Sequence, residues 1–579
     1  METFNSTSSV IKSKVVKLIT CKYFCFKKSY MKHFAWTIIL LSLLSVKTYA
    51  QAPNWLWAKS ANGVAPNYKQ GITKDTNGNV YITGNFETPT ITFGSIVLTN
   101  AGGFDIYIVK YNSVGNVVWA KNAGGTGYDI GQSITIDISG NVIITGEFSS
   151  PTLTFGSTVL TPSGFSNYFI AKYDSSGNPI WAKGATVATK SSGNNVTTDN
   201  FGNIYVTGQY ENSSIDFGLG LLTNSGFSDF FLLKYSPSGI LLWSKNNGGA
   251  SYEQGECVKT DDNGNVYVTG FFYSSVITFD TVNLTNAGPT TTPDVFLNKY
   301  DSSGNIIWSK RAGGNNADYA RQIQIDGSGN IILVGHFISM NVSFGSTTLS
   351  SLGGNDILIL KYDNLGNIVW AKSSGGAEFD YALGVDIDMY NNIYVGGVFA
   401  STSITLDTIT LNNNDTFVNT YDCFVTKIDS LGNIVWAKSY GGIDNDYLGE
   451  IVTEDNGDLY STGYFGSDTL NFGNTNLVLT GVLNVYTAKL SDFTTDIVSK
   501  ESFSKLQVYP NPANDKLYIN GLTNDSKFSI YNNIGQLQFE GIYLGNNGID
   551  ISKLSKGFYI YSIVNKSNNT RTTGKFVKD

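Results

Sequence analysis

Short runs in which apolar and polar residues alternate occupy most of the chain. In one representative stretch these runs are residues 132–137, 141–148, 167–173 and 178–183, and they are rich in Ile, Val, Tyr, Phe and Thr. Alternation with a period of two over such lengths predicts half-buried β-strands. No stretch of this region shows helical periodicity of any length, so we predict an all-β fold.

The links between these runs predict how the strands pair. Asp-Ile-Ser-Gly-Asn joins the first two runs, and Asp-Ser-Ser-Gly-Asn joins the last two. Both predict tight hairpins, because Asp can hydrogen-bond its own turn backbone and Gly accepts the positive φ that closes the turn. The longer middle link contains Leu-Thr-Phe-Gly-Ser at residues 153–157, which predicts a small additional hairpin.

This pattern returns seven times. Each copy contains a tryptophan, usually within Trp-Ala-Lys. A glycine follows this tryptophan after 27 residues and an aromatic residue after 29 residues in every copy. The tryptophans are 62, 62, 62, 65, 62 and 66 residues apart, and a period of this kind indicates one structural unit copied in tandem. They are Trp57, Trp119, Trp181, Trp243, Trp308, Trp370 and Trp436.

Seven copies of four antiparallel strands predict a seven-bladed β-propeller. The two ends of the repeat array complement each other. Residues 54–59 form a final-strand sequence with no strand before it, and residues 485–490 form a third-strand sequence with no Trp-Ala-Lys after it. We therefore expect the N-terminal strand to complete the last blade and to close the ring. An open solenoid would need atypical capping repeats at its ends, and the sequence has none.

The repeated phrases also resemble a known family. They are Asp-x-x-Gly-Asn-Val-Tyr-Val-Thr-Gly-x-Phe, then Thr-Phe-Gly-Ser, then Lys-Tyr-Asp-x-x-Gly-Asn-x-x-Trp-Ala-Lys. Over residues 54–490 they are similar to the SBBP-type repeats of seven-bladed propellers in bacterial surface proteins. The resemblance implies a fold and no reaction, because propellers serve as enzymes, lectins and scaffolds.

The first fifty residues have the features of a secretory leader. Lys32 and His33 precede an apolar run at residues 34–46, and small residues precede a predicted cut after Ala50. The run is too short to span a bilayer, so we predict a cleaved signal peptide, with an uncleaved anchor as the alternative. We expect translation to begin at Met31. No cysteine follows the cut, so lipoprotein processing is not expected.

The C-terminal residues 505–579 leave the repeat and carry a different set of motifs. Tyr-Pro-Asn-Pro, Gly-Gln and Leu-x-x-Gly-x-Tyr follow one another over about seven short predicted strands, which favour a small β-sandwich. This stretch resembles the type A C-terminal sorting domain of the type IX (Por) secretion system. The residues that carry the resemblance are Tyr509, Pro510, Asn511, Pro512, Gly535, Gly557, Tyr559 and Lys575.

That resemblance implies a Bacteroidetes-type bacterium, the type IX machinery as a partner, and a mature protein that is secreted or held at the outer cell surface. We thus divide the chain into a leader at 1–50, a propeller at 51–490, a linker at 491–504 where cleavage would fall, and a sorting domain at 505–579. No stable transmembrane segment is expected after processing, and we expect a monomer.

The net charge and the few reactive side chains exclude several classes of ligand and of catalytic site. Without the leader's eight lysines and one glutamate, 30 basic and 45 acidic residues remain, a net charge of about −15 that argues against nucleic acid and anionic membranes. Cys257 and Cys423 fall in different blades and are expected to be free and buried. His336, the single histidine after the leader, occupies a variable strand position. These few residues do not suit a zinc site or a Ser-His-Asp triad.

Carboxylates are the remaining candidates for binding or catalytic groups. Ten residues after the tryptophans stand Asn67, Asp129, Ser191, Glu253, Asp318, Asp380 and Asp446, and aromatic residues lie beside them at Tyr68, Tyr128, Tyr252, Tyr319, Tyr381 and Tyr447. We expect these positions to form a rim around one mouth of the channel. Three roles remain open: holding backbone amides between blades, binding a cation such as calcium or sugar hydroxyls, and catalysis.

No cofactor is predicted, because the Asp-x-Asn-Gly-Asn turns lack the acidic alternation and closing Glu of a calcium loop. Nearly identical blades suit multivalent binding better than one asymmetric active centre. The leading hypothesis is therefore a non-catalytic surface module for adhesion or scaffolding that binds glycan or protein. The alternative is a carbohydrate-active hydrolase or lyase that uses paired carboxylates on the propeller face. A purely structural surface-layer component shares the same sequence features.

Overall fold

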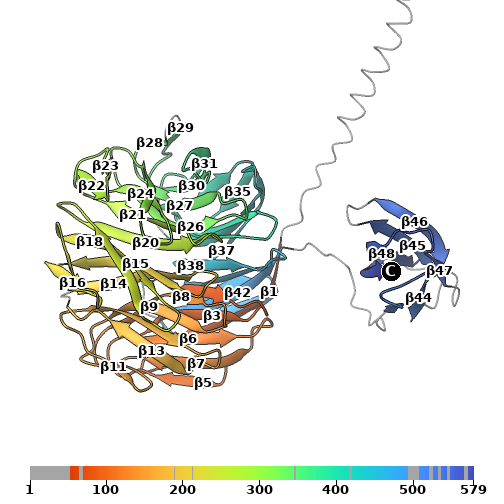
Figure 1. The fold of residues 1–579 in the computed structure, drawn as a ribbon, viewed down its shortest axis with the longest axis horizontal. Helices are drawn as coiled ribbons and strands as arrows, with labels where there is room; N and C mark the ends of the chain where they lie inside the picture. The colour runs from red at the N-terminus through yellow and green to blue at the C-terminus, as the bar shows by residue number, and fades with distance from the viewer. Residues whose placement is uncertain are drawn as a thin grey trace, which may run out of the picture. The chain divides into compact units, whose positions relative to one another are not determined.

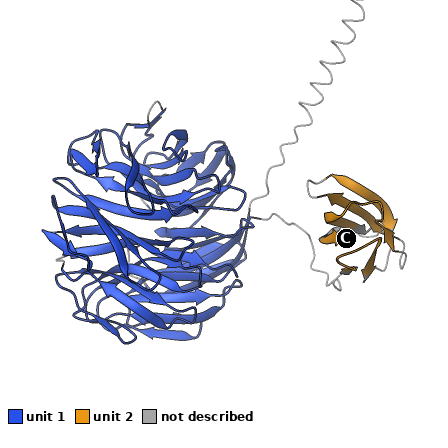
Figure 2. Cartoon of the chain, viewed as in Figure 1, with its two compact units in different colours: residues 1–494 blue, residues 495–579 orange. Residues whose placement is uncertain are grey.

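The computed structural model describes residues 53–492, except 64–68, 188–189, 212, 345–346 and 416–419, and residues 507–579, except 521–525, 533–535, 544–547 and 566–570. The chain divides into two compact units, Met1–Thr494 and Thr495–Asp579 (Figure 2). The predicted leader, with Met31 and the cut after Ala50, and residues 493–504 of the predicted linker lie outside the described residues.

Every regular element of the described chain is a strand, which confirms the all-β prediction. Over the same residues, no helix has the length and apolar character needed to cross a membrane.

The described part of the first unit contains seven antiparallel four-stranded sheets, which follow one another along the chain (Figure 1). We number them sheet 1 to sheet 7. Their strands are, in sheet 1, β2 (Gly71–Lys74), β3 (Val80–Phe86), β6 (Asp105–Tyr111) and β7 (Val117–Ala123); in sheet 2, β8 (Asp129–Ile136), β9 (Val142–Phe148), β12 (Asn167–Tyr173) and β13 (Pro179–Gly184); in sheet 3, β14 (Lys190–Thr198), β15 (Ile204–Glu211), β18 (Ser228–Tyr235) and β19 (Leu241–Asn247); in sheet 4, β20 (Glu253–Thr260), β21 (Val266–Phe272), β24 (Asp294–Tyr300) and β25 (Ile306–Ala312); in sheet 5, β26 (Asp318–Ile325), β27 (Ile331–Phe337), β30 (Asp356–Tyr362) and β31 (Ile368–Ser374); in sheet 6, β32 (Asp380–Ile387), β33 (Ile393–Phe399), β36 (Asp422–Ile428) and β37 (Ile434–Tyr440); and in sheet 7, β38 (Asp446–Thr453), β39 (Leu459–Phe465), β42 (Asn484–Ser491) and β1 (Asn54–Asn62).

The middle link of each repeat forms a separate two-stranded hairpin, as predicted for residues 153–157. These hairpins are β4–β5 (Thr90–Phe93, Ile96–Thr99), β10–β11 (Leu153–Phe155, Thr158–Leu160), β16–β17 (Ser214–Asp216, Leu221–Thr223), β22–β23 (Val276–Phe279, Val282–Thr285), β28–β29 (Asn341–Phe344, Thr347–Ser350), β34–β35 (Ser403–Leu406, Ile409–Asn412) and β40–β41 (Thr469–Phe472, Thr475–Val478).

In the tight turns, as predicted, an aspartate hydrogen-bonds the turn backbone and a glycine adopts a positive φ. In sheet 2, Asp137 Oδ1 accepts hydrogen bonds from the backbone N–H groups of Ser139 and Asn141, both at 2.9 Å. Gly140 has a φ of +78°, which favours glycine. Lys172 of β12 lies 2.7 Å from Asp137 Oδ2, so this turn is also tied to the third strand.

The repeated tryptophan couples one sheet to the next. Trp119 of sheet 1 donates its indole N–H to the carbonyl of Ser175 in sheet 2 at 3.1 Å. Trp57 on β1 donates in the same way to Ser113 of sheet 1 at 3.2 Å. Trp243 and Trp308 make the same bond at 3.3 Å, whereas the buried indole N–H groups of Trp181 and Trp370 do not. The bond therefore accounts for part of the recurrence of the tryptophan, since an indole N–H removed from water gains from such a partner.

The core lies between the sheets. Seven clusters of buried apolar residues each draw on two neighbouring sheets, and one of them joins Tyr460 and Val485 of sheet 7 to Ile82 and Tyr107 of sheet 1. The first strands contact one another in sequence, and β38 also contacts β2.

The pairing predicted for the two ends of the array is present. β1 runs antiparallel to β42, from Asn54 opposite Ser491 to Asn62 opposite Asn484 (Figure 1). The N-terminal strand is thus the outer strand of the last sheet.

In the second unit the described strands are β43 (Gln507–Tyr509), β44 (Lys516–Asn520), β45 (Ser526–Asn532), β46 (Leu537–Tyr543), β47 (Ile549–Asp550), β48 (Gly557–Asn565) and β49 (Arg571–Lys578). They form sheets in the orders β43-β44-β47 and β46-β45-β48-β49. Both sheets bury side chains in one core that includes Leu517, Phe528, Ile549, Ile563 and Phe576. Seven short strands were expected here.

Candidate functional site

A break in the regular strand pairing creates a cavity that several sheets line together. In six of the sheets the first strand contains a β-bulge, which turns one side chain away from the ladder. All six bulged residues line one cavity of about 490 Å³, which we call the central cavity. They are Gln132, Asn194, Glu256, Arg321, Leu383 and Gly449. Lys69, just before β2, adds a side chain from sheet 1.

One side of the central cavity is polar and charged. Glu256 lies 4.0 Å from Lys69 and 3.9 Å from Arg321, and Gln254 donates its amide to Glu256 at 2.6 Å. Glu147 also lines the cavity, and its burial raises its pKa although Ser166 donates to it at 2.9 Å. This side presents fixed donors and acceptors to a ligand.

The other side is aromatic. A chain of ring contacts, which we call the aromatic arc, runs from sheet 4 to sheet 7 in the order Tyr273, Phe271, Tyr319, His336, Tyr381, Tyr421, Tyr447 and Tyr464. Tyr381, Tyr447 and Tyr464 line the cavity directly. Successive centroids in the arc are 4.6 to 6.0 Å apart, the range of favourable ring pairs.

His336 occupies a central place in this arc. Its ring stacks on Tyr319 at 5.1 Å and meets the edge of Tyr381 at 4.6 Å, and only 3% of it is exposed. Burial, and then the charge of Arg321, lower its pKa well below the ordinary value, so it is neutral at pH 7. From the sequence alone His336 is an ordinary strand residue, because the repeat pattern does not show which rings meet across sheets.

Buried polar side chains fasten the first strands to one another below the cavity. Glu450 of β38 accepts from the N–H of Ile72 in sheet 1 at 3.1 Å and from the amide of Gln322 in sheet 5. Gln322 in turn accepts from the N–H of Val385 in sheet 6 at 2.5 Å. These bonds hold the strands that carry the bulged residues, so the cavity lining is positioned before any ligand arrives.

The five predicted rim carboxylates lie inside the protein. Each is fully buried and accepts from the N–H of a residue four positions earlier or from a serine of the same repeat. In Asp446, for example, Oδ2 accepts from Gly442 N–H at 2.7 Å and from Ser467 Oγ at 2.8 Å. The five are Asp129, Glu253, Asp318, Asp380 and Asp446. This placement suits the first predicted role of these carboxylates, which is to hold backbone amides. Most of the amides that they hold, however, belong to the same repeat and not to a neighbouring one.

Each rim carboxylate also faces a second buried carboxylate from the preceding sheet. Desolvation raises the pKa of both members, and the charge of the partner raises it further in at least one member of each pair. The pairs are Asp105 with Asp129, Asp229 with Glu253, Asp294 with Asp318, Asp356 with Asp380, and Asp422 with Asp446. Among the described residues, no group of three or more His, Cys, Asp or Glu side chains is arranged to hold a metal ion.

The predicted rim tyrosines separate into two sets. Tyr319, Tyr381 and Tyr447 belong to the aromatic arc. Tyr128 and Tyr252 precede the carboxylate instead of following it, are about half exposed, and pack on Phe104 and Phe227. The difference follows from position, because Tyr128 and Tyr252 lie in the links just before β8 and β20, whereas the other three tyrosines are the second residues of their strands. Asn67 and Tyr68 lie outside the described residues, and Ser191 is buried.

The two cysteines are free and buried, as expected. Cys257 Sγ lies 3.8 Å from the carbonyl of Ile323, and Cys423 Sγ lies 3.4 Å from that of Asp446.

The described sorting residues lie at the end of β43 and just after it, on β48, and on β49. Tyr509 stacks on Tyr518 at 5.7 Å, and Asn511 accepts from the N–H of Val577 at 2.9 Å. Tyr559 donates to the carbonyl of Ser555 at 2.9 Å, and Lys575 lies over the ring of Phe558. Pro510 and Pro512 fall in the same described segment, Gly557 begins β48, and Gly535 lies outside the described residues.

Comparison with known families matches residues 507–579 to the secretion system C-terminal sorting domain. This match marks the chain for export by the type IX secretion machinery, to the cell surface or the surrounding medium. It covers the second unit and says nothing about what the first unit binds.

The repeat region is similar to parts of longer proteins. An uncharacterised WD repeat-containing protein of Acanthamoeba polyphaga mimivirus is 26% identical over 76% of this chain and 39% of its own length. The regulatory protein FlaEY of Caulobacter vibrioides is 24% identical over 46% of this chain and 29% of its own length. The chain thus spans well under half of either relative.

Among solved structures, a variant of the Synechocystis apocarotenoid oxygenase aligns with 76% of this chain and 94% of its own, at 11% identity and a TM-score of 0.35. A score this low supports no inference about function.

Proposed function

We propose that the first unit is a closed seven-bladed β-propeller of the SBBP type, spanning residues 51–490. Three observations support this closure. β1 completes the sheet of β38, β39 and β42; β38 contacts β2; and a buried apolar cluster joins sheet 7 to sheet 1. A ring closed by strand exchange leaves no end that needs a cap.

We further propose that this propeller is a non-catalytic glycan-binding module displayed or released by type IX secretion. The observation that carries the proposal is the central cavity, with the aromatic arc on one side and charged and amide groups on the other. A sugar ring has an apolar face that suits aromatic side chains, and hydroxyl groups that suit amides, carboxylates and cationic donors. A cavity of about 490 Å³ also lies within the usual size of small-ligand sites.

The rim carboxylates support the site indirectly in this proposal. They are buried and hydrogen-bonded, so they position the loops between sheets and do not touch the ligand. The groups that we assign to contact are Tyr381 and Tyr447 on the aromatic side and Glu256 and Arg321 on the polar side.

A glycan array probed with the purified full-length chain tests the proposal, followed by titration calorimetry with the strongest oligosaccharide. We expect Tyr447→Ala to weaken binding at least tenfold, since it removes a ring from the cavity wall. Tyr128→Ala is the matched control, because Tyr128 is a half-exposed tyrosine outside the cavity. We expect EDTA to leave binding unchanged.

If no glycan binds, or if Tyr128→Ala and Tyr447→Ala weaken binding equally, the assignment of the central cavity to glycans is wrong. A loss of binding in EDTA would instead assign an ion to the site.

A further inference from the structure

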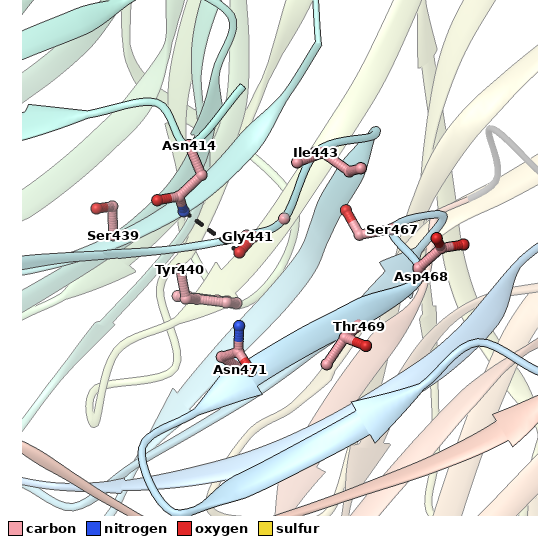
Figure 3. Close-up of a pocket in the computed structure, with 10 residues that line it drawn as sticks. Asn414, Ser439, Tyr440, Gly441, Ile443, Ser467, Asp468, Thr469 and Asn471 are labelled. Atoms are coloured by element: carbon pink, nitrogen blue, oxygen red, sulfur yellow. Dashed lines mark hydrogen bonds between the residues drawn. The ribbon is translucent and has the colours of Figure 1, made fainter. Parts of the chain in front are cut away.

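A second cavity, of about 500 Å³, lies between sheets 6 and 7 and away from the central cavity. The end of β37 and the following loop form one wall, and β40 with the residues before it forms the other (Figure 3). We call it the lateral cleft. None of its lining residues belongs to the central cavity.

In two other sheet pairs a side-chain hydrogen bond spans the equivalent gap, and in the cleft this bond is absent. Between sheets 3 and 4, Asn247 donates its side-chain amide to the carbonyl of Thr278 at 2.9 Å. Between sheets 5 and 6, Ser374 donates in the same way to Thr405 at 2.9 Å. These donors stand four residues after the repeat tryptophan, and their acceptors stand 35 residues after it. Alanine stands at the donor position in four further repeats (Ala61, Ala123, Ala185 and Ala312), so the absence of the bond does not by itself open the cleft.

At the equivalent position sheet 6 has Tyr440, which turns inward. Its ring meets Trp55 at 5.0 Å and Phe472 at 5.2 Å, and its hydroxyl lies 2.9 Å from that of Tyr486. Tyr440 therefore makes no bridge to Asn471, the counterpart of Thr278 and Thr405, and both residues line the open space.

The sixth repeat carries asparagine at a position where other repeats have a different residue, and this asparagine adds a polar group to the space. Asn414 lies in the lengthened link after β35, and its amide donates to Asp422 Oδ2 at 2.9 Å and to the carbonyl of Gly441 at 3.3 Å (Figure 3). The corresponding residue in sheet 1 is Ala101, which offers only its backbone N–H to Asp105. The amide oxygen of Asn414 thus adds an acceptor that sheet 1 lacks.

The lining has the chemistry of a sugar site. It presents the hydroxyls of Ser439 and Thr469, the amide of Asn471 and the exposed carboxylate of Asp468, and it includes no lysine or arginine. Ile443, 65% exposed, supplies an apolar edge. Hydroxyl groups can donate to and accept from such a set, whereas an anion would meet Asp468 without a compensating cation.

We propose that the lateral cleft is a second ligand site, which binds a neutral sugar residue. The proposal is independent of what occupies the central cavity. Two separate sites on one rigid chain would raise the avidity for a branched or repeating glycan.

Saturation-transfer NMR and calorimetry test this proposal. The neutral probes are the methyl glycosides of glucose, galactose, mannose and N-acetylglucosamine, and glucuronate is the anionic probe. We expect at least one neutral glycoside to bind, and glucuronate to bind more weakly. Ser439→Trp should fill the cleft and reduce affinity for that glycoside at least tenfold. Asn471→Ala, at an exposed position, is a second variant that should weaken binding even if Ser439→Trp disturbs folding.

The matched control is Ser373→Trp, at the equivalent position of sheet 5, where the bond from Ser374 to Thr405 closes the gap. It should leave binding unchanged, as should Tyr128→Ala, because Tyr128 lines neither cavity. The proposal is overturned if no neutral glycoside binds at concentrations of about 10 mM. It is also overturned if Ser439→Trp and Asn471→Ala both bind as the parent chain does, or if Ser373→Trp lowers affinity equally. Loss on Tyr447→Ala alone would place the sugar in the central cavity.

Discussion

Replacing Asp422 with asparagine should make the protein more stable at pH 8, and should stabilise it by less than half as much at pH 5. Burial, the amides of Asn414 and the charge of Asp446 set the pKa of Asp422, and the net effect raises it to about 7. Asp446, also buried, has its pKa raised to about 6. In water a carboxyl of this type titrates near 3.8.

The sign follows from proton linkage. Between pH 3.8 and about 7 the folded protein holds a proton at Asp422 that the unfolded chain has released. The free energy of unfolding therefore falls as the pH rises through this window, and the stability is full only below the unfolded pKa. Above pH 7 the folded state contains two buried carboxylates that face each other.

The magnitude comes from the same shift. A displacement of about three pKa units at roughly 1.4 kcal/mol each corresponds to about 4 kcal/mol. Since Asp446 titrates in the same range and shares the proton, we expect about half of this to be recovered by one substitution, or about 2 kcal/mol at pH 8. Asparagine is structurally acceptable, because Asn167 stands at the equivalent position of sheet 2 and donates to Ala185 O at 3.3 Å.

Urea unfolding followed by tryptophan fluorescence at pH 5 and pH 8 measures the effect. Asp429→Asn serves as the control: burial alone would raise the pKa of Asp429, but hydrogen bonds from Asn433 and from backbone amides lower it. That variant should lose stability at pH 8 and not gain it. If Asp422→Asn is destabilised equally at both pH values, the carboxyl pair does not limit stability and the reasoning is wrong.

Three further outcomes are expected. Gly115→Ala should lower the free energy of unfolding by about 1–2 kcal/mol, because Gly115 has a φ of +80° and a Cβ there would lie 2.8 Å from the Trp57 ring; urea titration measures it. Glu450→Ala should cost about 1–3 kcal/mol, since it leaves the buried N–H of Ile72 without its acceptor, and an unchanged unfolding midpoint would contradict the role given to this bond. Asn511→Ala should cost the second unit about 1 kcal/mol and speed hydrogen exchange at the Val577 amide; equal exchange in both chains would show that the bond is not maintained in solution.

The strands and their pairing followed from local pattern. In the second repeat β12 has the predicted bounds. β9 and β13 differ from the predicted ranges by no more than one residue at either end. β8 begins three residues earlier than predicted and ends one residue earlier. The partner of residues 54–59 was also predictable, because a four-stranded unit with one strand missing has one place to find it. The sorting residues were recognisable because they lie in short motifs that follow one another along the sequence.

The central cavity could not be predicted in this way. A β-bulge depends on the backbone geometry of the strand pair and leaves no strong mark in the alternation, so Glu256 and Arg321 went unnoticed. The rim carboxylates were found at the right period, but period does not distinguish a side chain that faces solvent from one that accepts from Ser467 in the interior.

The sequence alone therefore determined the repeating unit, its strands, the pairing of its two ends and the address for export, because each depends on residues close in the chain or on an exact period. Tertiary structure decided which polar groups are accessible. Burial and contact between different sheets depend on how all the copies pack together. The position of Tyr440, packed on Trp55 and Phe472 at the edge of a cleft, is therefore visible only in the folded protein.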